Sequence, residues 1–406
     1  MNNNNKTALV PRLRFSEFNT TGEWKTCTLS NLASRITTRN QDNSIKRVLT
    51  NSAIDGVVDQ SDYFDREVAN LNNLENYFVI DEGDYVYNPR ISVSAPVGPI
   101  SKNKVGKGVM SPLYTVFRFK NHNNDFYEQY FRTNLWHYYL KNVSNTGARH
   151  DRMSISNDSF MKMPLPYHSE KEQQKIADCL SSLDDLITAE DKKLEALGAH
   201  KKGLMQKLFP AEGKTLPEWR FPEFMDCDEW EEKTLIDICN MQAGNYVSAT
   251  EIDENRASDT FPCYGGNGLR GYTKTFTHNG KYPLIGRQGA LCGNVTLVEG
   301  AFHATEHAVV CTPSQRVVVE WLYYQLVMMN LNQYATGQAQ PGLSVKVLEK
   351  LQVKVPSTTT EQQQIADCLS CVDDLITEQV KKIEALRTHK KGLMQGLFPS
   401  IEEVSE

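Results

Sequence analysis

The chain of 406 residues contains one long segment twice. The first copy, Glu172–Pro210, begins EQQKIADCL and ends KKGLMQKLFP, and the second, Glu361–Pro399, begins EQQQIADCL and ends KKGLMQGLFP. Most positions are identical, and each residue of the second copy carries a number 189 higher than its counterpart. A shorter echo opens each half, PRLRFSEF from Pro11 and PEWRFPEF from Pro217. The segments between the echoes do not match, so the sequence predicts two similar frames with two different inserts.

Both copies have the periodicity of a long helix with a coiled-coil seam. Seam residues follow one another at alternating steps of four and three, which is the heptad pattern of period 3.5. The first seam consists of Ile176, Leu180, Leu183, Ile187, Glu190, Leu194, Leu197, Lys201 and Leu204. The second seam contains Leu369, Val372, Ile376, Gln379, Ile383, Leu386, Lys390, Leu393 and Leu397. Each helix is expected to end at its Phe-Pro, because proline disfavours helical geometry in the residue before it.

The two helices are expected to pack on each other as an antiparallel pair, because either one alone would expose its apolar stripe. Both seams are interrupted by polar residues in the same two layers. A register that places Glu190 opposite Lys390 and Lys201 opposite Gln379 would match these layers, since polar seam residues can fix a register. The alternative is that the polar residues face solvent or a partner subunit. A helix of roughly 33 residues would span about 50 Å.

Composition excludes several classes of protein. The hydrophobic fraction of 40% and the charged fraction of 23% are typical of globular proteins. No apolar run is long enough for a membrane span, and the N-terminal MNNNNKTALVP lacks the profile of a signal peptide, so a cytoplasmic location is expected. Cys368 and Cys371 have metal or redox spacing, but no second pair lies nearby in the sequence, which favours packing within the helix.

The charge of the chain is unevenly distributed. A net charge of −6 does not fit a protein that simply coats nucleic acid. Among the charged side chains, acidic ones predominate in residues 42–84, whereas basic ones predominate in residues 90–152 and 264–354. Local patches rather than the total charge govern phosphate contacts, so the two basic stretches remain candidates for binding DNA.

Each insert is predicted to be a mixed, strand-rich domain. The first is predicted to form strands at Tyr77–Ile80, Asp84–Asn88 and Leu113–Phe119 and a helix at Phe126–Leu140. The second is predicted to form strands at Tyr282–Ile285, Gly293–Val298, Ala308–Cys311 and Leu351–Val355 and a helix at Val318–Leu331. In both, a glycine-containing loop follows the helix, at 145–149 and at 335–339. This common order predicts one fold with divergent surfaces.

Polar residues that can read bases gather on the predicted loops. Arg and Lys read guanine, and Asn and Gln read adenine, through paired hydrogen bonds to base edges. The candidates in the first insert are Asn88, Arg90, Lys102, Lys104, Lys107, Arg149, His150 and Arg152. Those in the second are Asn267, Arg270, Arg287, Gln288, His303, Gln338 and Gln340. For any single residue an ordinary surface role is the alternative, and the neighbouring glycines also suit tight turns.

The sequence contains no recognisable catalytic constellation. There is no phosphate-binding P-loop, no helicase motif and no methyltransferase tetrapeptide, and Asn88-Pro89-Arg90 is the nearest string to the last of these. His303 and His307 frame Glu306, but they lack the order of a helical zinc motif. A hydrogen-bonded β-segment or a base-contacting loop is therefore favoured there over a metal site. The prediction is a protein without catalysis of its own.

These features resemble the specificity (S) subunit of type I restriction–modification systems. The resemblance is carried by the duplicated EQQxIADCLSxxDDLIT…KKGLMQxLFP segments. The RFxEF…EW…TL openings, the Gly108–Tyr114 segment and the YGGNG…IGRQG pattern support it. It implies an α+β fold in which two strand-rich target-recognition domains are separated by two long helices that form an antiparallel coiled coil with pseudo-twofold symmetry.

The resemblance also implies partners and a function. Each domain would read one half of a bipartite, non-palindromic site in double-stranded DNA, and the helices would dock two modification (methyltransferase) subunits and the restriction subunits. S-adenosylmethionine, ATP and Mg would act in those partners, and this chain would hold no cofactor or metal. The seam residues are thus also candidates for subunit docking.

The domain boundaries follow from the repeats. A disordered tail is expected at 1–10, the first target-recognition domain at 11–170 and the first repeated helix at 171–210. The second target-recognition domain is expected at 211–360, the second repeated helix at 361–399 and a tail at 400–406. The alternatives are a non-enzymatic tandem scaffold or ligand-binding protein, a single-chain nuclease or methyltransferase, and a specificity subunit of a methylation-only system.

Overall fold

A computed structural model describes residues 9–63, 74–144, 151–289, 291–337 and 341–401. The chain divides into two compact units. The first unit contains Met1–Ala189 and Ile383–Glu406, and the second unit contains Glu190–Lys382. Both boundaries fall inside the repeated segments, so each unit contains part of both long helices.

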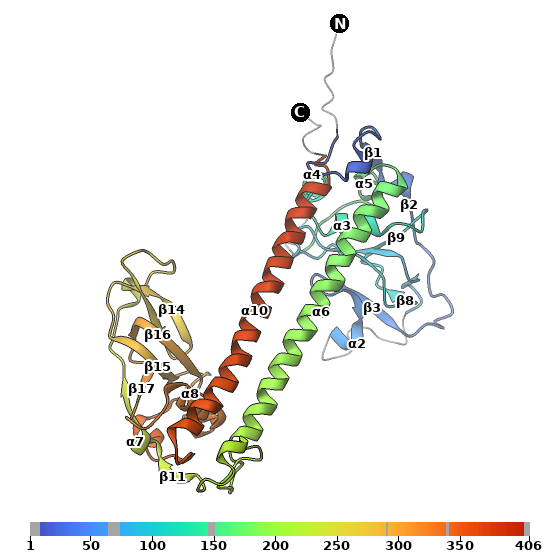
Figure 1. Cartoon of the computed structure of the whole chain (residues 1–406). Coiled ribbons are helices and arrows are strands. Elements are labelled where there is room, and N and C mark those ends of the chain that lie inside the picture. Colours follow the sequence, from blue (N-terminus) through green and yellow to red (C-terminus); the bar gives the residue numbers. More distant parts are fainter. Residues whose placement is uncertain (1–8, 64–73, 145–150, 290, 338–340, 402–406) are drawn as a thin grey trace. The chain divides into compact units, whose positions relative to one another are not determined.

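The repeated segments form the two long helices α6 (Glu170–Leu208) and α10 (Thr359–Leu397), each of 39 residues (Figure 1). At 1.5 Å per residue, each helix is about 58 Å long. Both helices end at the leucine before Phe-Pro, as the sequence predicts. Glutamates lie in the first turn of each helix, where the partial positive charge of the helix N-terminus favours them.

In the first unit, the beginning of α6 packs against the end of α10. Ile176, Ala177 and Leu180 of α6 share a core with Leu397 and Phe398, at the end of α10. The ammonium of Lys390 lies 2.5 Å from a carboxylate oxygen of Asp184. These contacts match an antiparallel arrangement of the two helix segments.

In the second unit, the end of α6 packs against the beginning of α10. The amide of Gln379 donates to the Glu190 carboxylate at 2.6 Å, and Lys201 lies 2.6 Å from Asp373. The predicted register is therefore wrong, because Lys201 pairs with Asp373 instead of Gln379, and Glu190 pairs with Gln379 instead of Lys390. The partners Asp184 and Asp373 stand beside the seam rather than on it, which the seam pattern alone does not reveal.

The first unit contains three small sheets. A four-stranded sheet has the order β2-β9-β6-β7, a second has the order β4-β3-β8-β5, and β1 pairs with β10. The strands are β1 (Lys25–Thr28), β2 (Ala33–Arg35), β3 (Val48–Ser52), β4 (Gly56–Asp59), β5 (Phe78–Ile80), β6 (Tyr85–Tyr87), β7 (Ile100–Lys102), β8 (Gly108–Met110), β9 (Thr115–Phe119) and β10 (Pro164–Tyr167). The shorter helices are η1 (Ser16–Phe18), α1 (Leu29–Leu32), α2 (Gln60–Tyr63), α3 (Asp125–Phe131), α4 (His137–Val143) and α5 (Asn157–Met161).

The helix predicted at Phe126–Leu140 is two helices, α3 and α4. The hydroxyl of Thr133 donates to the carbonyl of Tyr130 at 2.7 Å, and the indole of Trp136 donates to the carbonyl of Phe131 at 3.1 Å. These side-chain donors occupy carbonyls at the end of α3 and favour a turn there. The apolar periodicity continues across the turn, which is why the sequence suggests a single helix.

The second unit contains one six-stranded sheet with the order β12-β17-β15-β16-β13-β14, and a separate pair of β11 and β18. The strands are β11 (Glu231–Thr234), β12 (Cys239–Ala243), β13 (Phe261–Gly265), β14 (Gly268–Thr273), β15 (His278–Gly286), β16 (Val295–Ala304), β17 (Ala308–Pro313) and β18 (Gln352–Val355). The helices are η2 (Pro222–Phe224), α7 (Leu235–Ile238), η3 (Ala249–Glu251), α8 (Val319–Met328), η4 (Leu331–Tyr334) and α9 (Val345–Leu348). Helix α8 packs on β15 and β16 (Figure 1).

The two units have the same strand topology. If β5 and β6 are joined into one strand and β7 and β8 into another, the two sheets of the first unit become β2-β9-(β5/β6)-(β7/β8)-β3-β4. This is the order of the six-stranded sheet of the second unit. The parallel pairing of β3 with β8 corresponds to that of β13 with β16. The prediction of one fold in both inserts is therefore confirmed at the level of topology.

The opening motifs anchor each unit to a long helix. Arg14 donates two hydrogen bonds of 2.8 Å to the carboxylate of Glu172, and the indole of Trp24 donates to the same carboxylate at 3.3 Å. In the second unit, Arg220 and Trp230 bind Glu361 in the same way, at 2.8 Å and 3.1 Å. The bond to Glu172 raises the pKa of Arg14. The repeated arginine, tryptophan and glutamate are thus one buried structural motif, present twice.

Candidate nucleic-acid interface

In the first unit, one corner brings Asn88, Arg90 and Arg152 together. The corner begins directly after β6, where Arg90 and Arg152 form an isolated antiparallel bridge. The amide of Met153 donates to the carbonyl of Pro89 at 2.9 Å, and the amide of Ile91 donates to the carbonyl of Asp151 at 3.0 Å. Residues about sixty positions apart in the sequence are thereby held side by side by backbone hydrogen bonds.

Asn88 fixes the shape of this corner. Its side-chain amide donates to the carbonyl of Asn51 at 2.9 Å, and its side-chain oxygen accepts from the amide of Arg90 at 3.0 Å. Gly98, with a φ of +81°, packs so closely that a β-carbon there would lie 2.0 Å from the carbonyl oxygen of Asn88. Asn88 therefore uses its polar groups inside the domain, whereas the side chain of Arg90 is exposed.

The second unit has the same corner after β15. The amide of Leu343 donates to the carbonyl of Arg287 at 2.9 Å, the amide of Gly289 donates to the carbonyl of Pro341 at 3.0 Å, and Gln288 forms a bridge with Gly342. These three pairings match those of the first corner one by one. Arg287 occupies the place of Pro89, and Gln288 occupies the place of Arg90.

The glycine-rich turn between β13 and β14 closes over this second corner. A β-carbon at Gly286 would lie 1.9 Å from the carbonyl oxygen of Gly266, and one at Gly266 would lie 3.0 Å from that of Gln288. The turn therefore places Asn267 and Arg270, both exposed, close to the chain that carries Gln288. The YGGNG and IGRQG motifs, predicted only as separate turns, form one surface.

The turn from Thr305 to His307 completes the second corner. The carbonyl of His307 accepts from the amide of Arg287 at 2.9 Å, and the imidazole of His307 lies 3.3 Å from the carboxylate of Glu306. Three buried polar atoms lie here without a hydrogen-bond partner among the described residues: Nε of Arg287, Oε2 of Glu306 and Nδ1 of His307. Glu306 and His307 are absent from the predicted DNA contacts, although the sequence favoured a β-segment or base-contacting loop at this position.

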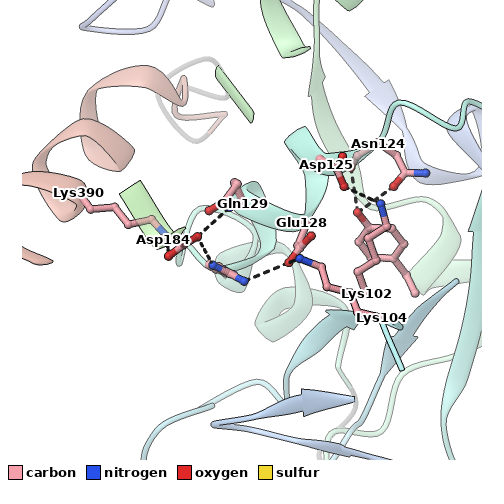
Figure 2. A network of polar contacts seen from close by, with 10 residues as sticks. Lys102, Lys104, Asn124, Asp125, Glu128, Gln129, Asp184 and Lys390 are labelled. Carbon is pink, nitrogen blue, oxygen red and sulfur yellow. Dashed lines mark hydrogen bonds and ion pairs between the residues drawn. The ribbon is translucent and has the colours of Figure 1, made fainter. Parts of the chain in front are cut away.

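Two of the predicted DNA contacts take part in an ion-pair network inside the first unit (Figure 2). Lys102 binds Asp125 at 2.6 Å, and its side chain is 13% exposed. Lys104 binds Glu128 at 2.7 Å, and its side chain is 62% exposed. Glu128 is joined through Arg132 to Asp184 (Figure 2). Lys102 is therefore mainly structural, whereas the ammonium of Lys104 can reach solvent.

The remaining candidates lie in varied positions. Lys107 is exposed, next to β8. His303 is 5% exposed, and its ring lies 2.9 Å from the Thr275 hydroxyl and 3.2 Å from the Asn245 carbonyl, so its burial argues against a direct contact with DNA. Four further candidates lie outside the described residues: Arg149, His150, Gln338 and Gln340.

Every predicted seam residue is buried or partly buried. A second, outer stripe is also repeated on the long helices: Cys179 and Leu186 on α6, and Cys368 and Leu375 on α10. Leu186 and Leu375 are exposed, although both are large and apolar. Each long helix therefore carries one exposed leucine at the equivalent position of the repeat.

The described residues include no cluster of three or more His, Cys, Asp or Glu side chains arranged to hold a metal ion. Cys371 is exposed and Cys368 is partly buried. No helix in the described part of the chain is long and apolar enough to cross a membrane.

Comparisons with known proteins match both units. A family model described as the type I restriction modification DNA specificity domain matches residues 24–199 and again residues 227–386. The type I restriction enzyme EcoprrI specificity subunit of Escherichia coli is 45% identical over 161 residues, and this match spans 39% of the chain and only 40% of that relative. The MjaVIII specificity subunit of Methanocaldococcus jannaschii is 27% identical over 326 residues, which are 72% of this chain and 74% of that protein.

Solved structures show the same fold. The crystal structure of the type I restriction–modification system S subunit from M. genitalium superimposes with a TM-score of 0.63. The match covers 97% of this chain and 100% of that one, at 15% sequence identity. The structural likeness therefore extends over both strand-rich units and the long helices, although most of the amino acids differ.

Proposed function

The chain belongs to the family of type I restriction–modification DNA specificity subunits, and we propose that each of its two units reads one half of a split DNA site. The family supplies DNA sequence recognition rather than catalysis. The observation that supports a split site is the repeated corner. The same backbone hydrogen bonds hold it in both units, but they present Pro89 and Arg90 in one and Arg287 and Gln288 in the other. Two corners with the same backbone hydrogen bonds but different side chains suit a DNA site whose two halves differ in sequence.

We place the DNA contacts on these two corners and on the loops beside them. In the first unit, Arg90 and Arg152 carry the positive charge, with Lys104 and Lys107 nearby in the sequence. In the second unit, Asn267, Arg270, Arg287 and Gln288 are the candidate contacts. The predicted contacts outside the described residues are Arg149, His150, Gln338 and Gln340. The net charge of −6 fits this role if partner subunits share the phosphate contacts that give non-specific affinity.

We also propose that the long helices dock two modification subunits. The exposed leucines Leu186 and Leu375 are equivalent by the repeat and lie on α6 and α10, so each long helix offers one exposed apolar side chain to one of two identical partners. Restriction subunits would join the same assembly, and S-adenosylmethionine, ATP and Mg would bind to these partners. Leu186→Asp together with Leu375→Asp is expected to prevent co-purification of the modification subunit.

The length of the helices supports a spacing role. A helix has a fixed rise per residue, so inserting one heptad adds about 10 Å. Insertion of seven residues into both α6 and α10 is expected to change the gap between the half-sites, or to abolish assembly, while the bases that are read stay the same. Altered base identity at constant spacing would contradict this role.

Methylation sequencing of single DNA molecules tests the proposal most directly. Cells would express this chain beside its neighbouring modification gene, and control cells would lack only this chain. A split motif with methylated adenine that appears only with the chain is the expected result. If the chain is soluble and bound to the modification subunit but no motif appears, recognition of a split site fails as a proposal, and the scaffold interpretation gains support.

A further inference from the structure

The corner of the second unit carries hydrogen-bonding groups that the first unit lacks at equivalent positions. The backbone pairings align Arg287 with Pro89, since each carbonyl accepts from the residue that begins the returning segment, Leu343 or Met153. The equivalent corner therefore presents a guanidinium in the second unit and a proline ring in the first.

The neighbouring turn shows the same contrast. The amide of His307 contacts the hydroxyl of Thr305 at 3.4 Å, and the amide of Leu113 contacts the hydroxyl of Ser111 at 3.4 Å. The next amide in each turn donates to the carbonyl of that Thr or Ser, at 2.9 Å and 3.0 Å. Glu306 thus corresponds to Pro112, and His307 corresponds to Leu113, which is 59% exposed.

The polar groups of the second corner are not needed to hold its shape. Two hydrogen bonds fix the backbone of Arg287. Its amide donates to the carbonyl of His307, and its carbonyl accepts from the amide of Leu343. The first corner has Pro89, Pro112 and Leu113 in these places, and it keeps the hydrogen bond from the returning segment to the Pro89 carbonyl although proline has no amide hydrogen to donate. Groups that a fold does not require are available for recognition.

The same three side chains contain the polar atoms that lack a partner. A buried donor or acceptor without a hydrogen bond is unfavourable, and folded proteins retain few such atoms. Here one nitrogen of Arg287, one oxygen of Glu306 and one ring nitrogen of His307 are unsatisfied together, at one corner, within the described residues. The corner thus supplies a donor from Arg287 and, from the turn that the Arg287 amide contacts, an acceptor from Glu306, whose other carboxylate oxygen lies 3.3 Å from the His307 ring.

We infer that this corner reads a G·C base pair in the half-site bound by the second unit. The inference rests on the proposed recognition of DNA and assigns a base pair to it. Guanine presents two acceptors, N7 and O6, at the major-groove edge, and the fork of an arginine matches both. The paired cytosine presents its N4 amino group, which donates a hydrogen bond to a carboxylate. Arg287 would contact guanine and Glu306 would contact cytosine, with His307 positioning the carboxylate.

Adenine–thymine pairs fit this corner less well. The adenine edge presents one acceptor beside one donor, so an arginine fork cannot be satisfied by it in the same way. Thymine adds a methyl group, which suits an apolar contact instead. The exposed Leu113 of the first unit has that character, so the equivalent corners are fitted to different base pairs.

Binding competition with the assembled complex of this chain and its modification subunit tests the inference. The probe is a duplex that contains the methylated motif of the wild type, and the competitors carry a substitution at one base pair each. Arg287→Ala and Glu306→Gln are both expected to lower the preference for G·C at one and the same position, roughly tenfold to a hundredfold. All other positions, in both half-sites, should remain as in the wild type.

Lys274→Ala is the matched control, because it removes one positive charge from an exposed side chain of the same unit. It should leave the preference at every base pair unchanged. Arg287→Lys keeps the charge but not the fork, so it should also relax the G·C position if the arginine makes two hydrogen bonds.

The outcomes separate the two proposals. If the wild type methylates no split motif, the proposed function fails irrespective of Arg287. If the wild type has a motif but Arg287→Ala and Glu306→Gln retain full selectivity, the assignment of this corner is overturned. Relaxation of an A·T position, or of two different positions by the two variants, would overturn it as well.

Discussion

The first unit interrupts two strands that run unbroken through the second. The segment β5–β6 corresponds to β15, and β7–β8 corresponds to β16. In the first unit the break is closed by backbone bonds between Gly83 and Asn103 at 2.8 Å and between Asn103 and Asp84 at 2.6 Å. In the second unit Gly280 and Gly300 face each other at positive φ, so the two strands bend without breaking.

This contrast shows which parts of the topology are constrained. Both units share the strand order and one parallel pair of strands, β3 with β8 or β13 with β16. They also share the corner that follows β6 or β15. The strand lengths and the side chains that cover the corners differ. Under the proposed function, a shared frame with divergent corners would allow one unit to change the bases it reads without loss of the contacts that hold it to the long helices.

The largest effect is expected where the two frames are most alike. Glu172→Ala leaves the buried Arg14 without its partner and removes the acceptor of the Trp24 indole. Breaking a buried pair from one side costs about 3–5 kcal/mol in the free energy of unfolding. Glu361→Ala should cost the second unit a similar amount, because Arg220 and Trp230 are bound identically.

Urea denaturation followed by tryptophan fluorescence measures both losses. If the units unfold in separate transitions, each variant should shift only one of them. Glu172→Gln keeps a side-chain acceptor and should cost less than Glu172→Ala. A difference of several kcal/mol between the two alanine variants would show that the two frames are not energetically equivalent.

The next effect distinguishes the two corners. Gly286 and Asn88 are equivalent, since their amides donate to the carbonyls of Asn294 and Pro99 at 2.9 Å and 3.0 Å. A β-carbon at Gly286 would lie 1.9 Å from a backbone oxygen, so Gly286→Ala should destabilise the second unit by about 1–3 kcal/mol through overpacking. Asn88→Ala should cost only about 0.5–1.5 kcal/mol, because of its two side-chain hydrogen bonds only the one to the Asn51 carbonyl is part-buried, whereas the one from the Arg90 amide is exposed to water.

Thermal unfolding of the two variants would check this order, and the methylated motif would show the functional consequence. Gly286→Ala should impair recognition of the half-site read by the second unit and leave the other half unchanged. A larger loss of stability from Asn88→Ala than from Gly286→Ala would contradict the alignment of the corners.

A smaller effect depends on pH and concerns the ion pair beside the seam. Burial would raise the pKa of Asp184, but hydrogen bonds from Lys390 and Gln129 and the charge of Arg132 outweigh burial, so the pKa lies below its ordinary value. The pKa of Lys390 is also lowered, because burial lowers it more than the hydrogen bond and the charge of Asp184 raise it. The lowered pKa of Asp184 therefore sets the pH dependence of this pair on the acid side.

The sign of the pH dependence follows from the lowered pKa of Asp184. The carboxylate stabilises the folded chain above its unfolded pKa of about 3.9, and this contribution is lost as the pH falls through the lower folded pKa. Asp184→Asn should therefore reduce the loss of stability between pH 5 and pH 3 by about 1 kcal/mol or less, since water screens a half-buried group. Asp185→Asn, at an exposed neighbour, should leave that pH dependence unchanged.

The sequence predicts the elements of this fold better than their long-range partners. The strands β5, β6, β9, β15, β17 and β18 and both long helices follow from local periodicity. The register of the helices does not, because Asp184 and Asp373 lie beside the seam and bind lysines across the helix pair. The bridge between Arg90 and Arg152 is also invisible to local pattern, although the composition of both loops identifies their chemistry.

The same limit applies to the candidate site. Residue type alone identifies arginines and amides next to glycine turns, such as Arg287 and Gln288, as candidate contacts. Lys102 has the same chemistry as Lys104 in the sequence, but only the fold shows that Asp125 holds it. A base-contacting loop around Glu306 and His307 is one of two alternatives from the sequence, but their equivalence to Pro112 and Leu113 is visible only from the hydrogen bonds of the two turns.

The smallest effect separates the two lysines. Lys104→Ala removes an exposed charge whose pair with Glu128 contributes little to stability, so unfolding should change by no more than about 0.5 kcal/mol. If Lys104 contacts a phosphate, the variant should weaken DNA binding uniformly across sequences and lower the salt slope, the dependence of log affinity on log salt concentration, by about 1.

Lys102→Ala removes the pair with Asp125 and the contact of its ammonium with the Tyr85 ring, so it should reduce stability more and leave the salt slope unchanged. Binding of the complex to its site at 50–200 mM salt, a range over which phosphate contacts dominate the change in affinity, distinguishes the two. An unchanged salt slope for Lys104→Ala would remove Lys104 from the proposed DNA contacts and leave it only the ion pair with Glu128.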